Sequence, residues 1–139
     1  MKLDTKQKVL LAIYIEYQKD IPNIEQEVKA DKLGIGLDEF KIAIAKLENE
    51  GLIRGTVISN MGNSKWGIGI VALDDTKMTP YGIDYVETKL GIDKTLNGME
   101  KVQDMAKKSA NWGWNEFKDI TVKVLAEMGK HGIDKVMGD

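Results

Sequence analysis

The chain has 139 residues, enough for one domain with a hydrophobic core, and 42% of them are hydrophobic, which is ordinary for a globular protein. It contains no cysteine, which excludes disulfides and thiol chemistry and fits a reducing cytoplasm. Its 20 basic and 22 acidic residues give a formal charge of −2, so no overall positive charge attracts the chain to nucleic acid.

Neither a membrane span nor a signal peptide is expected. No apolar run approaches the ~18 residues that cross a bilayer. The first stretch, "MKLDTKQKVLLAIYIEY", is amphipathic, carries Asp4 and Glu16, and is followed by no small-residue cleavage site. We therefore expect a cytoplasmic protein without membrane contact.

Two helices are predicted at the start of the chain. Apolar residues recur at helical spacing from Thr5 to Tyr17, which predicts an amphipathic helix capped by Asp4 or Thr5. After a loop that ends at Pro22, Asn23 can cap a second, short helix, "IEQEVKADKLG". Gly34 is expected to end this helix.

A third helix, a hairpin and a fourth helix follow. The third helix is predicted from Leu37 to Glu50, before Gly51, with one apolar face formed by Phe40, Ala43, Ile44 and Leu47. The period then changes to about 2, and "LIRGTVIS" and "KWGIGIVAL", joined by the turn "NMGN", predict a β-hairpin. The fourth helix is "MTPYGIDYVETKLG", with Thr79 as cap, Pro80 as first residue and Gly91 as end.

Three helices, a hairpin and one more helix form the layout of a winged helix-turn-helix, in which the third helix reads DNA and the hairpin is the wing. The stretch "FKIAIAKLENEGLIRG", the hairpin and "MTPYGIDYVETKLG" resemble the YjcQ-like family, small winged-helix proteins of Firmicutes and their prophages, over roughly residues 5 to 92. The resemblance implies this fold and origin and supplies no catalytic motif. The expected fold class is α+β, mostly helical.

Two parts are predicted: a winged-helix domain, residues 1–92, and a C-terminal appendage, residues 93–139, of two amphipathic helices separated at "NWG". The apolar stripes of the appendage are expected to form a homodimer contact. Its residues are Trp112, Trp114, Phe117, Ile120, Val124 and Met128. Two alternatives remain: the appendage folds back over Trp66 or the first helix, or the dimer forms on the first helix through Val9, Tyr14 and Tyr17.

Double-stranded DNA is the first predicted ligand. Lys41, Lys46, Arg54 and Lys65 would meet phosphates, and Asn49, Asn60 and Asn63 would reach bases or sugars. The third helix nevertheless begins with Asp38 and Glu39, which would face phosphates, although acids also stabilise a helix N-terminus. Residues 51 to 78 carry three bases and two acids, so paired wings in a dimer would help DNA binding.

The alternative function is a protein-interaction module, such as a phage-type inhibitor or adaptor of a host protein. At about 100° per residue, Ile42 and Ala45 lie opposite the apolar face of the third helix. Apolar side chains in this position suit contact with a partner protein at least as well as contact with DNA.

An enzyme, a cofactor and a metal site are not expected. His131 is the only histidine and lies in the glycine-broken stretch "KHGIDK". Asp74 and Asp75 are adjacent carboxylates, but no further ligand has a spacing typical of metal sites.

Overall fold

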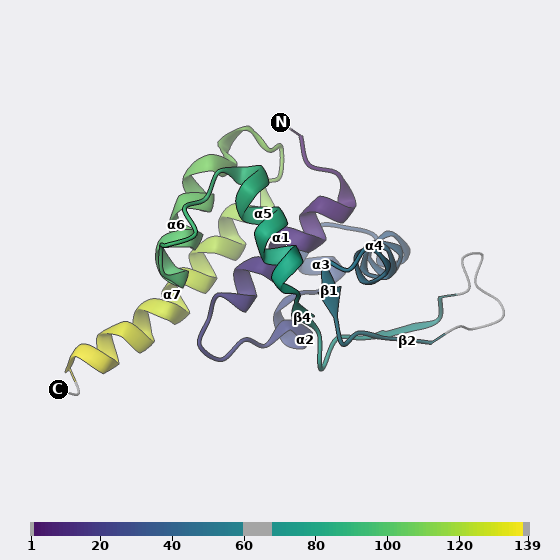
Figure 1. Ribbon diagram of the computed structural model, residues 1–139, viewed down its shortest axis with the longest axis horizontal. Coiled ribbons are helices and arrows are strands. Elements are labelled where there is room, and N and C mark those ends of the chain that lie inside the picture. Colours follow the sequence, from purple (N-terminus) through teal and green to yellow (C-terminus); the bar gives the residue numbers. More distant parts are fainter. Residues whose placement is uncertain (1, 60–67, 138–139) are drawn as a thin grey trace.

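The computed structural model describes residues 2–59 and 68–137, with side chains described up to residue 129. The elements in chain order are α1 (Thr5–Tyr17), α2 (Ile24–Glu27), α3 (Ala30–Leu33), α4 (Leu37–Asn49), β1 (Ile53–Arg54), β2 (Val57–Ser59), β3 (Ile70–Ala72), β4 (Lys77–Met78), α5 (Pro80–Leu90), α6 (Gly98–Lys108), the 3-10 turn η1 (Ser109–Asn111) and α7 (Glu116–Met137) (Figure 1). The described chain is thus α+β and mostly helical, as predicted. Its order of elements is compatible with a winged helix.

Helix α1 lies at the centre of the molecule. All eight residues from Val9 to Glu16 are buried, and α1 contacts α2, α3, α4, α5, α7 and β4. Figure 1 shows the other helices arranged around it. The prediction of an amphipathic α1 is therefore wrong, because a helix enclosed on every side is apolar all round. Val9 and Tyr14, proposed as an alternative dimer surface, are fully buried.

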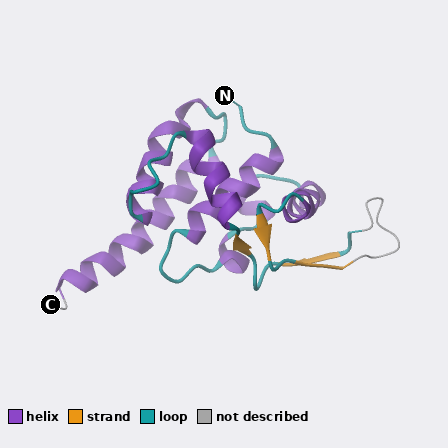
Figure 2. Cartoon of the chain, viewed as in Figure 1, coloured by secondary structure: helices purple, strands orange, loops and turns teal. Residues whose placement is uncertain are grey.

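The strands form two antiparallel pairs within one long hairpin. β1 pairs with β4, with Ile53 opposite Met78, and β2 pairs with β3, with Ile58 opposite Val71. The pairs are separated at Gly55, whose φ is +81°, and a Cβ there would lie 2.1 Å from the carbonyl oxygen of Asp75. The second pair projects from the helical body (Figure 2), and we call Val57–Ser59 with Ile70–Ala72 the β2–β3 arm.

The predicted helix ends are largely confirmed. Asp4 caps α1 through the backbone N–H of Gln7, and Thr79 caps α5 through that of Gly82. Gly34 and Gly91 have the left-handed backbone that ends a helix.

The single helix predicted between Asn23 and Gly34 is wrong, because the chain forms the two short helices α2 and α3. In one continuous helix, Ile24 and Leu33 would point in opposite directions. The extended backbone at Val28 and Lys29 breaks the helix, so Ile24, Val28 and Leu33 are all buried.

The C-terminal helices pack onto the rest of the chain. Trp112, Trp114 and Phe117 are buried in the same core as α1, and the Trp114 Nε1 donates a hydrogen bond of 3.0 Å to the Leu33 carbonyl oxygen. Val124 is buried and Ile120 and Met128 are half-buried against the same core. The predicted dimer contact through these residues is not supported, because the chain itself covers them. A shared core does not show whether residues 1–92 fold alone, so the domain boundary stays a prediction.

A buried polar network joins α1, α5 and α6. The carboxylate of Glu87 accepts a hydrogen bond of 2.7 Å from the Tyr14 hydroxyl and lies 2.7 Å from the Lys101 Nζ, at only 2% exposure. Burial alone would raise the pKa of Glu87, but the hydrogen bonds from Lys101 and Tyr14 and the charges of Lys101 and Lys94 hold this pKa below its usual value. Glu87 is therefore charged at neutral pH.

A second buried carboxylate, Glu16, connects the end of α1 to α7. Its Oε2 accepts a hydrogen bond of 2.9 Å from the Asn23 N–H. Its Oε1 lies 2.9 Å from the Lys19 Nζ, and this lysine also pairs with Glu127 on α7. Burial raises the pKa of Glu16, and the Asn23 and Lys19 contacts offset this only in part. The two buried acids thus have pKa values shifted in opposite directions.

Replacing Phe117 with Ala tests the packing of α7. Its side chain is fully buried, so the free energy of unfolding should fall by ~3–5 kcal/mol. The matched control is Val122→Ala on the same helix, where the side chain is 59% exposed and the change should stay within ~0.5 kcal/mol. Urea unfolding of both variants measures this, and equal small effects would contradict the packing of α7.

The two acids should respond to pH in opposite ways. Glu87 stabilises the folded protein above its unfolded pKa of 4.5, and this stabilisation is lost as pH falls through the lowered pKa of the folded state. Glu87→Gln should therefore lower the free energy of unfolding by about 3 kcal/mol at pH 7 and by less in acid. The contribution of Glu16 to the free energy of unfolding is present below its unfolded pKa of 4.5 and is lost as pH rises through its raised folded pKa. Glu16→Gln should therefore gain stability relative to the wild type as pH rises. Urea titrations between pH 3 and 7 measure the free energy of unfolding of each variant relative to the wild type. If this difference changes with pH in the same direction for both variants, the opposite pKa shifts of the two acids are rejected.

Candidate functional site

Helix α4 presents the surface on which the functional hypotheses depend. It buries Phe40, Ala43, Ile44 and Leu47, which confirms its predicted inner face. No described side chain caps its N-terminus. The carboxylate of Glu39 lies against Gly36, so close that a Cβ on this glycine would be 1.9 Å from Glu39 Oε2. An acid at this position meets the positive end of the helix dipole, which gives the acidic start of α4 a structural role.

The outward side of α4 mixes acidic, amide and apolar groups. Asp38, Lys46 and Asn49 are exposed, while Ile42 and Ala45 are half-buried. The predicted contact residues Ile42 and Ala45 are therefore only partly available to a ligand. The Lys46 carbonyl oxygen accepts a hydrogen bond from the Glu50 N–H, but no described residue is bonded to the Lys46 ammonium.

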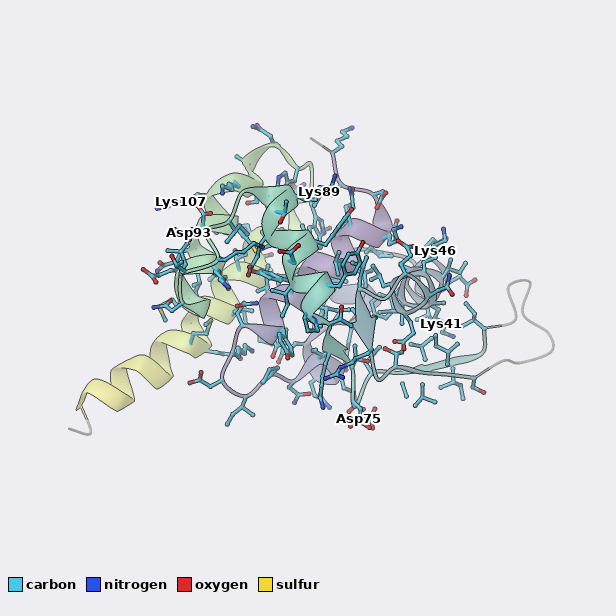
Figure 3. All side chains as sticks on the ribbon, viewed as in Figure 1. Lys41, Lys46, Asp75, Lys89, Asp93 and Lys107 are labelled. Atoms are coloured by element: carbon cyan, nitrogen blue, oxygen red, sulfur yellow. The ribbon has the colours of Figure 1, made fainter. Side chains whose placement is uncertain are left out.

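Lys41 connects α4 to the β2–β3 arm. Its Nζ donates a hydrogen bond of 2.8 Å to the carbonyl oxygen of Gly69, just before β3. Figure 3 shows Lys41 on the side of α4 next to the arm and Lys46 on a different side. Because the Lys41 ammonium is bound to the protein itself, a phosphate would have to displace the Gly69 carbonyl.

The base of the hairpin carries the remaining predicted cations. Arg54 and Lys77 are opposite each other in the β1–β4 pair, and both are exposed. Exposed Asp74 and Asp75 lie in the turn before β4 (Figure 3 labels Asp75). The predicted contacts Asn60, Asn63 and Lys65 lie outside the described residues, as does Trp66.

The charge around α4 and the hairpin is negative. Residues 37–59 and 68–79 contain six acidic and four basic side chains. Lys65 alone would not reverse this balance. A duplex approaching α4 and the hairpin would therefore gain no net attraction from the described charges.

Large apolar side chains are exposed on the same elements. Six large apolar side chains are exposed in the described parts of the chain, and three of them lie on these elements. They are Leu37 on α4, 59% exposed, and Val57 and Ile70 on the arm, 62% and 58% exposed. The pairing of Ser59 with Ile70 and of Val57 with Ala72 puts Val57 and Ile70 on one face of the arm. We call Leu37, Val57, Ile70 and the outward side of α4 the α4–arm surface. Helix α4 and strand β3 are in contact, and exposed apolar groups on neighbouring elements are typical of protein contact sites.

Among the described residues, no group of three or more histidines or acids is arranged to hold a metal ion. No described helix is long and apolar enough to cross a membrane. The side chain of His131 lies outside the described residues.

Comparison with known proteins identifies the family. The family model described as YjcQ protein matches residues 7–105, well over half of the chain. The chain belongs to the YjcQ family. The match continues beyond residue 92 into α6, where Lys101 pairs with Glu87, so the family region includes this buried ion pair. The curated proteins contain no match, and neither do the solved structures.

Lys41→Met tests whether the lysine holds the arm in place. The variant keeps the aliphatic stem and removes the donor to Gly69, so the Gly69 N–H, which donates to the Ser59 carbonyl, should exchange with solvent several-fold faster. The global free energy of unfolding should change by about 1 kcal/mol or less. Lys46→Met is the control, because no described residue is bonded to the Lys46 ammonium. Equal Gly69 exchange rates in the two variants, measured by NMR, would show that Lys41 does not restrain the arm.

Proposed function

We propose that this YjcQ family member is a small, non-catalytic, cytoplasmic winged-helix protein of a bacterial or prophage regulatory system. In this proposal α4 is the second helix of the helix-turn-helix and the β2–β3 arm is the wing. The α4–arm surface binds a protein partner. The observation that carries the proposal is the combination, on this surface, of three exposed large apolar side chains with an excess of acids.

The same surface is poorly suited to a DNA groove. A reading helix usually presents cationic or amide side chains near its N-terminal half. Here that half exposes Asp38 and Glu39, and its one lysine, Lys41, is bound to Gly69. Exposed Leu37 would meet the duplex at the same end, where the thymine methyl is the only apolar group that the major groove offers.

DNA binding with transcription regulation remains the second candidate function. It is favoured by the exposed cations Arg54 and Lys77, which stand side by side at the base of the wing, together with exposed Lys46 and Asn49 on α4. These groups suit contacts to phosphates at one edge of the surface. A homodimer through the C-terminal helices is not part of either proposal, because those side chains lie in the core of the chain.

Duplex binding separates the two candidates. We expect the dissociation constant for random-sequence duplex DNA to be weaker than about 100 μM at physiological salt. The control is the double variant Arg54→Glu/Lys77→Glu, whose affinity should be equally weak. Tight binding that falls steeply with salt and is lost in the double variant, measured by fluorescence anisotropy at two salt concentrations, would favour DNA instead.

Site-specific cross-linking tests the protein partner directly. A photo-cross-linking amino acid in place of exposed Asp38 should capture a discrete protein in cells of the native host. The same amino acid in place of exposed Gln103 on α6 should not, because Gln103 lies outside the α4–arm surface. Identical capture from both positions, or none from Asp38, would reject this surface as the site of contact.

A further inference from the structure

A groove of about 650 Å³ lies between the α2–α3 segment, the start of α4 and strand β3. Its two walls include the consecutive residues 28–31 on one side and 71–74 on the other. Side chains of an extended strand alternate between two faces, so a groove that touches neighbouring residues of a strand must meet the strand edge. The groove therefore exposes one edge of the β3 backbone, at Val71 and Ala72.

This edge of β3 has no partner strand among the described residues. β3 pairs only with β2, in a two-stranded sheet, and the described residues form no backbone hydrogen bond between residues 28–31 and residues 70–74. Yet Val28 and Lys29 on the opposite wall are extended, with φ/ψ of −101°/95° and −133°/148°. Unpaired N–H and C=O groups on a strand edge are a template for an additional strand.

The rest of the groove defines what kind of strand fits. Apolar side chains of Ile35, Leu37 and Phe40 line it, and Leu37 is 59% exposed at the first position of α4. A side chain placed on Leu37 would therefore remove apolar surface from water.

The charged residues that line the groove are mostly acidic. Among the described lining residues they are Glu25, Asp31 and Asp74, with Lys29 as the one base, and all four are exposed. This charge disfavours nucleic acid and acidic peptides. It is complementary to a segment with basic ends.

We propose that the groove binds an extended segment of a partner protein that adds to the free edge of β3. The segment pairs with β3 through backbone hydrogen bonds, directs alternate apolar side chains toward Leu37 and Phe40, and carries lysine or arginine at its ends. The inference rests on the proposed function as a protein-binding module, and adds the conformation and chemistry of the bound segment.

The test is a selection of displayed random nonapeptides on the full-length chain. Enriched peptides should alternate apolar and polar residues and carry lysine or arginine at the ends. Leu37→Asp should weaken their binding by roughly tenfold or more, as expected for an apolar contact at the centre of an interface. Val122→Asp is the matched control, because Val122 is also 59% exposed on a helix but does not line the groove. It should leave binding unchanged.

Two further measurements test the mode of binding. The double variant Asp31→Lys/Asp74→Lys should shift the selection toward peptides with acidic ends. With a selected peptide bound, the exposed amides among Val71, Ala72 and Leu73 should exchange with solvent more slowly, and N-methylation of the peptide backbone should abolish this effect. Circular dichroism verifies that each variant is folded.

The contrary outcomes are distinct. No enriched peptide, enrichment of acidic peptides, or full binding by Leu37→Asp would overturn the groove proposal. A dimer of the full chain that Leu37→Asp dissociates, detected by light scattering, would make a second copy the occupant and would also overturn it. Failure of the peptides alongside specific cross-linking from position 38 would reject the groove and leave the proposed function standing.

Discussion

The complete burial of α1 is the constraint on which the structure depends. A helix with eight consecutive buried residues needs neighbours on every side, and no single sheet or helix pair can provide them. The α2–α3 segment, α4, α5 and the C-terminal helix α7 together enclose it. Two of its buried residues, Tyr14 and Glu16, are polar, and each is bonded by groups from other parts of the chain. The C-terminal helix α7 is thus part of the enclosure of α1.

The two buried carboxylates have different energetic roles. Glu87 is held in its charged form by a hydroxyl and by lysines, and it joins α1, α5 and α6 at one point. Glu16 is penalised by its burial, yet it binds the loop after α1 through Asn23 and Lys19. Buried ion pairs contribute little net stability compared with apolar packing, but removing one member leaves an uncompensated charge. These networks therefore fix how the helices are arranged more than they add to stability.

Local signals in the sequence predicted local structure well. Caps such as Asp4 and Thr79 and stops such as Gly34 and Gly91 act within a few residues, so the sequence reveals them directly. The inner face of α4 was equally predictable, because Phe40 and Leu47 follow the helical period. The break at Val28 was also visible in principle, since Ile24 and Leu33 cannot point the same way in one helix.

Contacts between distant residues could not be predicted in this way. The bond from Lys41 to Gly69 removes a cation from the predicted DNA contacts, and nothing in the local pattern around Lys41 indicates it. The bond from Trp114 to Leu33 decides between folding back and dimerisation, yet the two residues are 81 positions apart. An apolar stripe shows that a helix needs a partner, and only the tertiary structure shows which partner it has.

The enclosure of α1 also has a consequence for the synthesis of the protein. α1 is synthesised before the other described helices, but Lys19 pairs with Glu127, 108 positions further along the chain, and the Leu3 N–H donates a hydrogen bond to the Trp112 carbonyl oxygen. Until α7 has been made, the nascent chain cannot complete the native cover of the apolar stretch from Val9 to Ile15, the kind of surface that chaperones bind and that promotes aggregation. Native burial of this stretch therefore depends on a helix that leaves the ribosome well after α1.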